Sequence, residues 1–191
     1  MFHSYIMVQL GSLNSIVTTV ANETACFLKG TKILVLNKQW EEVYIPIEDL
    51  NEEYLIKTYL HGYRRIKLLG NGKLMNNVNS ITSCLYKLKS TNELFDDLIV
   101  TCGHSILVSE LSPEEELKQR LVWENIKKID DKYLLLAGIS SDFEKIMDNN
   151  EYEIFHICCE DEDNHDQQYG IYANGILTES ISYNSFHDYF Q

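Results

Sequence analysis

The sequence has little proline and no long apolar run. Only 2 of its 191 residues are Pro, and no Pro-rich or Gly/Ser-rich linker divides it, so we expect a single domain. No apolar run approaches the roughly 20 residues that a transmembrane helix needs. Residues 1–25 also lack the basic start of a secretory signal. We therefore expect neither membrane insertion nor secretion.

Positive charge is scarce as well. The chain has 16 Lys and Arg against 29 Asp and Glu, which gives a formal net charge of −13. Binding to nucleic acid requires clustered Lys and Arg, and anionic membranes attract basic segments. The charge balance therefore indicates no nucleic-acid partner and no membrane partner.

The cysteines do not form the pattern of a disulfide framework. There are 5 of them, an odd number, and none belongs to a CxxC pair. This usage is typical of an intracellular, reducing compartment. The five are Cys26, Cys84, Cys102, Cys158 and Cys159.

Short β-rich runs separated by turn residues dominate the chain after Ala25, which predicts an all-β fold. Helical signals are few. Ser112, Pro113 and the acidic residues that follow predict a short helix over 113–121, and residues 141–147 suggest another turn or two. Gly70-Asn71-Gly72 predicts a turn. The expected strands are 31–36, 43–47, 54–59, 65–69, 83–88, 98–101, 105–108, 133–137, 152–158 and 169–177.

Cys26 stands at the entry to the first expected strand. A thiolate is a good nucleophile once a nearby base or positive group lowers its pKa. Residues 1–25, before it, carry one charged side chain, Glu23, and are rich in Ser, Thr, Val and Asn. We interpret them as a separate leading segment.

Two further segments contain residues suited to chemistry or to a tight turn. In Thr101-Cys-Gly-His104, a glycine turn between two strands would direct both the hydroxyl and the imidazole to one spot. A His there could donate a proton to a departing amide nitrogen. Asn174-Gly175, between apolar strand residues, predicts a hairpin or a bulge, with a structural role for both residues.

In this order, the segments resemble the Hint (hedgehog/intein) domain family. Residues 26–33 are similar to its opening block, Thr101 and His104 to its TxxH block, and residues 173–176 to its last block. His156 falls where intein-like Hint proteins without splicing activity often carry a His. Residues 46–50 and 55–58 are similar to a further stretch, although Glu53-Tyr54 stands where the family usually has Gly-Asp. The resemblance covers about 26–183 and is closest to stand-alone Hint proteins of large DNA viruses. For a viral protein, the reducing compartment would be the host cytoplasm.

The resemblance implies a horseshoe of two similar, intertwined β halves over residues 26–183, with a tail at 184–191. It also implies an N-to-S acyl shift at the Ala25-Cys26 bond, for which the leading segment is the substrate. Thr101 would strain the bond and stabilise the oxyanion, His104 would protonate the leaving nitrogen, and His156 would assist. Water or a small thiol would then resolve the thioester and release residues 1–25, without a cofactor or a metal.

The sequence after residues 173–176 differs from that of splicing inteins. In splicing inteins the last strand ends with His-Asn, and the Asn side chain cyclises to cut the chain. The corresponding places hold Glu179 and Ser180, which cannot cyclise in that way. We therefore expect N-terminal cleavage without splicing.

Three alternatives remain open at this point. The first is a catalytically silent Hint-fold interaction module. The second is a zinc-binding module built from His156, Cys158, Cys159 and His165. The third is a cysteine hydrolase that acts on other proteins with Cys26 and His104, which needs an Asn or Asp to orient the His.

Overall fold

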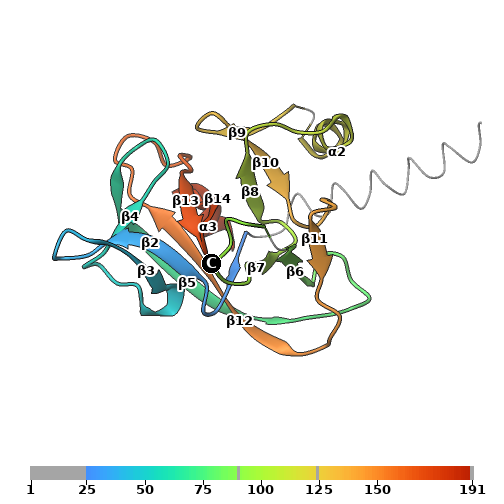
Figure 1. The fold of residues 1–191 in the computed structure, drawn as a ribbon, viewed down its shortest axis with the longest axis horizontal. Coiled ribbons are helices and arrows are strands. Elements are labelled where there is room, and N and C mark those ends of the chain that lie inside the picture. Colours follow the sequence, from blue (N-terminus) through green and yellow to red (C-terminus); the bar gives the residue numbers. More distant parts are fainter. Residues whose placement is uncertain (1–24, 90, 124, 190–191) are drawn as a thin grey trace, which may run out of the picture.

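The structure, a computed structural model, describes residues 25–89, 91–123 and 125–189, and within these ranges it is built almost entirely from β-strands (Figure 1). The predicted all-β fold with few short helices is confirmed. The elements are β1 (Phe27–Leu28), β2 (Lys32–Leu36), β3 (Glu42–Pro46), the 3-10 helix η1 (Ile47–Asp49), β4 (Leu55–Lys57), β5 (Tyr63–Met75), β6 (Leu85–Leu88), β7 (Ile99–Thr101), β8 (Ser105–Val108), α2 (Pro113–Trp123), β9 (Lys128–Ile129), β10 (Lys132–Leu136), β11 (Phe143–Lys145), β12 (Glu151–Cys159), β13 (Gly170–Ala173), β14 (Ile176–Glu179) and α3 (Tyr183–Tyr189).

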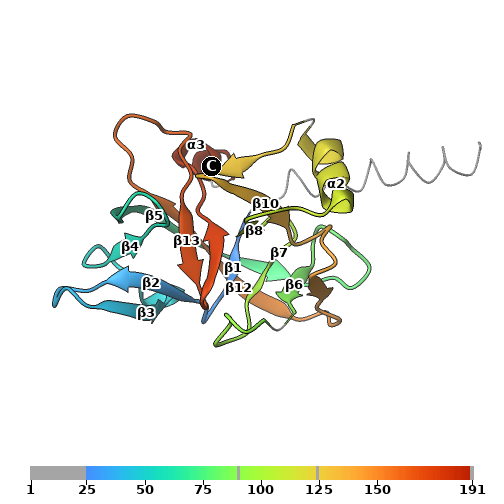
Figure 2. The same ribbon diagram turned by 45° about the horizontal axis from the view of Figure 1, so that its top comes forward.

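The strand order divides into two halves. The hydrogen-bonded order is β11-β6-β7-β1-β12-β5 in the first half and continues as β4-β2-β13-β14-β8-β10-β9 in the second, with β3 beside β2. The β13/β14 hairpin of the second half lies between β2 and β8 (Figures 1 and 2). The halves are intertwined along the chain, because β1 and β5 belong to the first half whereas β2 and β4, which lie between them in the sequence, belong to the second.

Two local predictions were wrong. The chain does not turn at Gly70-Asn71-Gly72, because β5 runs straight through these residues and pairs Gly70 with His156 and Gly72 with Ile154 of β12. Residues 141–147 do not form a helix, because Phe143–Lys145 is strand β11, paired with β6, and Phe143 is buried in the core. In both places, pairing with a distant strand overrides the local signal.

The predicted helix at 113–121 is confirmed as α2. The Ser112 hydroxyl accepts the Glu115 N–H at 3.3 Å, and the Glu115 carboxylate accepts the Ser112 N–H at 2.8 Å. This reciprocal pair is a capping box, which satisfies two backbone donors at the start of the helix. No helix in the described part of the chain is both long and apolar enough to span a membrane.

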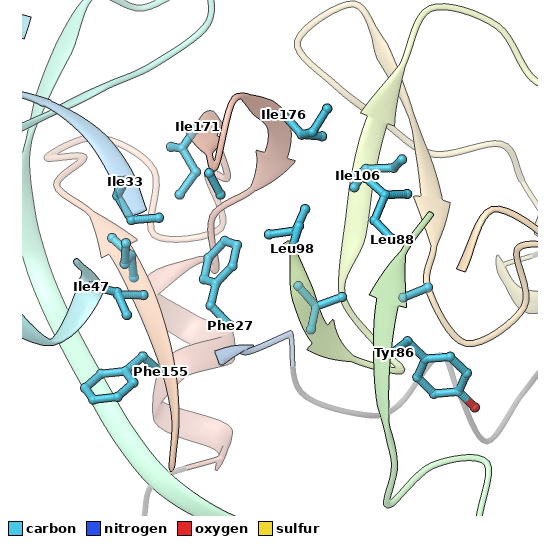
Figure 3. Packing of buried hydrophobic residues seen from close by; sticks show 14 of the residues in the cluster. Phe27, Ile33, Ile47, Tyr86, Leu88, Leu98, Ile106, Phe155, Ile171 and Ile176 are labelled. Carbon is cyan, nitrogen blue, oxygen red and sulfur yellow. The ribbon is translucent and has the colours of Figure 1, made fainter. Parts of the chain in front are cut away.

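The main core is filled by apolar side chains from both halves (Figure 3). In β12, Phe155, Ile157 and Cys159 face this core, and Cys158 belongs to a second cluster with Ile181 and Phe186. Side chains alternate between the two faces of a strand. Helix α3 therefore covers the face of β12 that points away from the main core, and it occupies most of the segment that we expected to be a tail.

Of the hairpin and the bulge that Asn174-Gly175 left open, the structure has the hairpin. Ala173 pairs with Ile176, and the two turn residues have φ of 48° and 94°, as a two-residue turn of type I′ requires. The Asn174 side chain accepts the Lys32 N–H at 2.7 Å and donates to the Asp97 carbonyl at 2.7 Å. The turn thus ties the start of β2 to the loop that precedes β7.

Gly175 should be far less replaceable than Gly30, although both have positive φ. A Cβ at Gly175 would lie 2.2 Å from the backbone oxygen of Glu93, whereas a Cβ at Gly30 would meet nothing within 4 Å. We expect Gly30→Ala to lower the free energy of unfolding by about 1–2 kcal/mol, the cost of the left-handed backbone alone. Gly175→Ala should cost clearly more in urea unfolding, and equal losses would contradict this account of the turn.

Candidate active site

Cys26 is held in place by Thr101. The Cys26 N–H donates to the Thr101 hydroxyl at 2.9 Å, and the Thr101 N–H donates to the Cys26 carbonyl at 3.0 Å. Cys26 directly precedes β1, and Thr101 is the last residue of the neighbouring strand β7. The nitrogen of the Ala25-Cys26 peptide bond is therefore fixed against a hydroxyl oxygen.

His156 contacts the other side of the same peptide bond. Its Nδ1 lies 2.9 Å from the Ala25 carbonyl oxygen. Because a carbonyl oxygen only accepts, Nδ1 must carry the proton. The Cys26 Sγ lies 3.5 Å from Nδ1 and 3.9 Å from Nε2 of the same ring. One imidazole thus reaches both the carbonyl and the thiol that would attack it.

Thr101 and His156 therefore contact different atoms of the scissile peptide bond. Thr101 lies at the nitrogen of the Ala25-Cys26 bond, whereas the hydrogen-bond donor at its oxygen is His156. The family resemblance placed His156 in the site, but its contact with the Ala25 carbonyl was not predicted. That contact depends on the register between β1 and β12, in which Phe27 pairs with Phe155.

His104 is buried in the loop between β7 and β8. Its ring lies edge-on to Phe27, with 4.2 Å between centroids, and neither ring nitrogen has a hydrogen-bond partner among the described residues. Burial lowers its pKa to about 3, and the charge of the neighbouring His156 acts in the same direction. Leaving a buried polar atom unpaired costs about 1–3 kcal/mol, so this arrangement marks His104 as a candidate functional residue.

Burial keeps the resting site uncharged. It raises the pKa of the Cys26 thiol to about 12, against the opposing effect of a hydrogen bond with Thr101. It also lowers the pKa of His156, which the hydrogen bond to the Ala25 carbonyl partly offsets. The thiol is therefore protonated at neutral pH and needs a base before it can attack.

Glu179 supports the loop that contains His104. It is 5% exposed, and one carboxylate oxygen accepts the N–H of Ser105 at 2.6 Å. The Gln168 side chain donates to the other oxygen at 3.3 Å. Burial raises the pKa of Glu179 to about 7, while the Ser105 N–H acts in the opposite direction. The sequence marked Glu179 only as a replacement for the intein residue, and the contact with Ser105 was not predicted.

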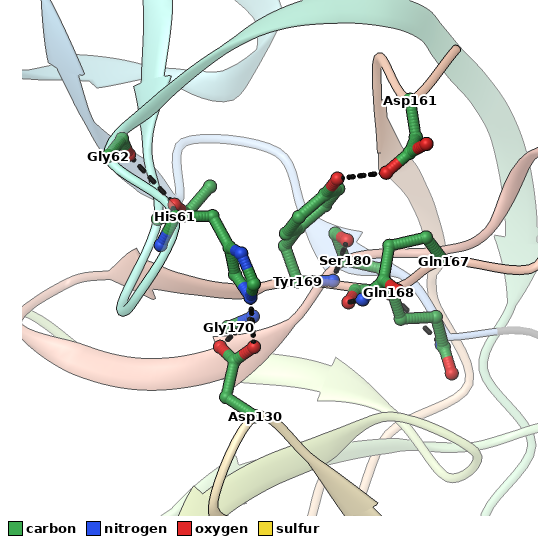
Figure 4. Close-up of polar contacts among 10 residues, drawn as sticks. His61, Gly62, Asp130, Asp161, Gln167, Gln168, Tyr169, Gly170 and Ser180 are labelled. Atoms are coloured by element: carbon green, nitrogen blue, oxygen red, sulfur yellow. Dashed lines mark hydrogen bonds and ion pairs between the residues drawn. The ribbon is translucent and has the colours of Figure 1, made fainter. Parts of the chain in front are cut away.

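A second polar cluster surrounds Asp130 and Tyr169 (Figure 4). The His61 Nε2 donates to the buried Asp130 carboxylate at 2.7 Å, and the Tyr169 hydroxyl donates to Asp161 at 2.5 Å. The Ser180 hydroxyl accepts the Tyr169 N–H at 2.9 Å. These contacts tie loops and strand ends together, and they place Ser180 in a structural role.

The structure does not support a zinc site. Within the described ranges, no group of three or more His, Cys, Asp or Glu side chains lies close enough to hold a metal. Cys158 and Cys159 point to opposite faces of β12, and the His165 ring lies against Tyr183. All five cysteines are free thiols.

The hydrolase alternative also loses its support. A Cys-His hydrolase needs a third group that orients the imidazole. In the described part of the chain, neither nitrogen of His104 meets such a group.

No protein-family model and no curated protein matches the sequence. Among solved structures, the chain is similar to a DnaB intein from Synechocystis sp. PCC 6803, with 13% identity, a TM-score of 0.47, and coverage of 82% of this chain and 99% of the intein. It is also similar to the Ssp DnaB mini-intein variant M86 (17% identity, TM-score 0.46, coverage 83% and 95%) and to the TvoVMA intein (12% identity, TM-score 0.44, coverage 81% and 96%).

All three TM-scores lie below 0.5. These matches give no support to the expected resemblance to viral Hint proteins, which stays a prediction.

The raised pKa of Glu179 predicts a pH-dependent stability. Its ordinary pKa of 4.5 rises to about 7 in the folded chain, so its stabilisation is complete below pH 4.5 and is lost as the pH rises through 7. Glu179→Gln keeps an oxygen for Ser105 but cannot ionise. The variant should therefore gain about 3 kcal/mol relative to the wild type between pH 4.5 and 8 in urea unfolding. A difference that does not change with pH would contradict this prediction.

Proposed function

We propose that this chain is a self-processing Hint-type domain that cleaves the Ala25-Cys26 bond through an N-to-S acyl shift, without splicing. The observation that carries the proposal is the position of His156. Its Nδ1–H donates to the Ala25 carbonyl oxygen at 2.9 Å, and the Cys26 thiol lies 3.5 Å from the same nitrogen. A donor aimed at a carbonyl beside a nucleophile is the arrangement that stabilises a tetrahedral oxyanion.

In the first step, Cys26 Sγ attacks the Ala25 carbonyl carbon. The thiol proton moves to the imidazole of His156, whose Nε2 is the unprotonated nitrogen of the neutral Nδ1–H form and lies 3.9 Å from Sγ. The carbonyl electron pair moves to the oxygen, where the Nδ1–H of His156 already donates. The negative charge thus forms where a donor is in place before the reaction.

In the second step, the C–N bond breaks and the Cys26 nitrogen leaves as an amine. It takes up the proton that sulfur lost to His156, so the imidazole of His156 becomes neutral again and the shift from amide to thioester is balanced without an external acid. His104, close enough to His156 for their charges to interact, would relay this proton, accepting it on one ring nitrogen while giving up its own proton from the other. The Thr101 hydroxyl keeps the departing nitrogen in position.

In the last step, water or a small thiol attacks the thioester and releases residues 1–25. Splicing would require a cyclising Asn at the end of β14. Glu179 stands there instead, and its carboxylate is occupied by the Ser105 N–H. This supports cleavage at the N-terminal side alone.

A second candidate function is a catalytically silent Hint-fold interaction module. Cys26 is 2% exposed and its thiol has a pKa of about 12, which favours this candidate because a resolving nucleophile must reach the thioester. The two functions differ in a single property, the integrity of the chain over time.

Intact mass spectrometry of the full chain tests the proposal. We expect the wild type, incubated with a thiol reductant, to yield a fragment that begins at Cys26, and to do so faster than without the reductant. Cys26→Ala should stay intact. Cys84→Ala, which removes another buried thiol, should cleave like the wild type. An intact wild type under all conditions would overturn the proposal in favour of the silent module.

The rate of the acyl shift should depend little on pH between 6 and 9. In the proposed first step the proton passes from the thiol to His156 within the site. Burial raises the pKa of Cys26 to about 12 and lowers the pKa of His156, so neither group changes its protonation state over this range. The first-order rate, followed by intact mass spectrometry in an excess of thiol reductant so that the shift limits the rate, should therefore vary by less than about threefold. A rate that rises tenfold with each pH unit would show that a preformed thiolate attacks, and would contradict the role of His156 as the base.

A further inference from the structure

Helix α3 lies against the face of β12 that bears His156. Cys158, two residues further on the same face, is buried with Ile181 and Phe186. The ring of Phe186 lies 5.6 Å from the ring of His156, centroid to centroid, at a tilt of 59°. A side chain from the end of the chain thus contacts the imidazole that reaches the peptide bond before Cys26.

The strand opposite His156 leaves room for this contact. Gly70 of β5 pairs directly with His156. A Cβ at Gly70 would lie 2.7 Å from Cζ of Phe186 and 3.1 Å from Cδ2 of His156. Two rings therefore occupy the space that a side chain would need, which explains a glycine in the middle of a long strand.

The packing against Gly70 involves one edge of the His156 imidazole, and the hydrogen bond to the Ala25 carbonyl involves the other edge. Cδ2 and Nδ1 are the two ring atoms bonded to Cγ. Cδ2 lies beside Gly70, while Nδ1 donates to the Ala25 carbonyl at 2.9 Å. A half-turn of the ring would exchange the two atoms and place a C–H at the carbonyl oxygen. Because the imidazole packs against Phe186 and Gly70, its rotation about the Cβ–Cγ bond is restricted.

Helix α3 is itself anchored to β12. The Ile181 N–H donates to the Ile157 carbonyl at 3.0 Å, and Ile181 forms a parallel bridge with Cys158. The Ser182 hydroxyl accepts the Ser185 N–H at 3.2 Å, and the Ser182 carbonyl accepts the Phe186 N–H at 3.0 Å. The position of Phe186 is therefore determined by backbone contacts with the strand that contains His156.

We infer that helix α3 belongs to the machinery of cleavage, with Phe186 and Gly70 as positioning residues that hold the Nδ1 edge of His156 against the Ala25 carbonyl. This inference rests on the proposed function. If α3 positions His156, then a change in the packing of α3, which follows the last strand, changes the rate of cleavage at the Ala25-Cys26 bond.

A pair of glycine variants tests this inference with a matched control. Gly70 and Gly72 lie two residues apart on β5, and a Cβ at Gly72 would meet nothing within 4 Å. We expect Gly70→Ala to slow cleavage on the order of 10²-fold, as misplacement of a catalytic group by about 1 Å does. Gly72→Ala should cleave at the wild-type rate. Equal rates for the two variants would contradict the inference.

Variants of the helix test the same contact from the other side. Phe186→Ala should slow cleavage, and Phe186→Leu, which keeps apolar bulk, should recover part of the rate. Asn184→Ala, on the same helix but at an exposed residue whose side chain donates to Asp166 at 2.8 Å, is the control and should leave the rate unchanged. Because Gly70 and Phe186 act on one ring, the effect of Gly70→Ala should shrink in the Phe186→Ala background.

The tautomer of His156 gives a readout that does not require turnover. In a Cys26→Ala background, where the Ala25 carbonyl stays in place, nitrogen NMR should show the Nδ1–H form of His156. Adding Gly72→Ala should preserve that form, and adding Gly70→Ala or Phe186→Ala should produce a mixture of tautomers.

The two proposals fail in different ways. If the wild type does not cleave but the tautomer follows this pattern, the proposed function fails and the positioning by α3 stands. If the wild type cleaves and neither rate nor tautomer responds to Gly70→Ala and Phe186→Ala, the positioning inference is overturned and the proposed function stands.

Discussion

The pairing of the two-residue strand β1 with β7 on one side and β12 on the other is the constraint on which the site depends. Phe27 is the residue through which both pairings run, since it lies opposite Val100 of β7 and Phe155 of β12. The first pairing brings the Thr101 hydroxyl to the nitrogen of the Ala25-Cys26 bond, and the second brings His156 to its oxygen. A shift of one residue in either register would turn these side chains to the opposite face.

Burial determines the chemistry that this geometry permits. The site holds a protonated thiol and two neutral imidazoles, because charge is disfavoured away from water. A reaction that moves one proton from sulfur to nitrogen creates no net charge and suits such a site. Among the residues that the structure describes, the two ring nitrogens of His104 have no hydrogen-bond partner, so this imidazole can still donate or accept a hydrogen bond when charge develops during the reaction.

Much of the fold could be predicted from local patterns, but the completed site could not. The Asn-Gly turn at residues 174–175 is specified by backbone conformation, and the helix after Ser112 by its cap, so both predictions were confirmed. Gly70-Asn71-Gly72 was interpreted as a turn because the rings that require Gly70 to lack a side chain come from β12 and α3, far away in the sequence. The contact of His156 with the carbonyl, and that of Glu179 with Ser105, depend on strand register for the same reason.

The most direct test of the central claim is to trap the acyl group. Hydroxylamine attacks a thioester much faster than an amide, and it would leave a hydroxamate on the residue that carried the acyl group. We predict a hydroxamate at the carboxyl end of Ala25 and a complementary fragment that begins with an unmodified Cys26, both located by tandem mass spectrometry. A chain that stays intact in hydroxylamine, or that is cut at any other bond, would contradict the claim that the Ala25-Cys26 bond is the reactive one.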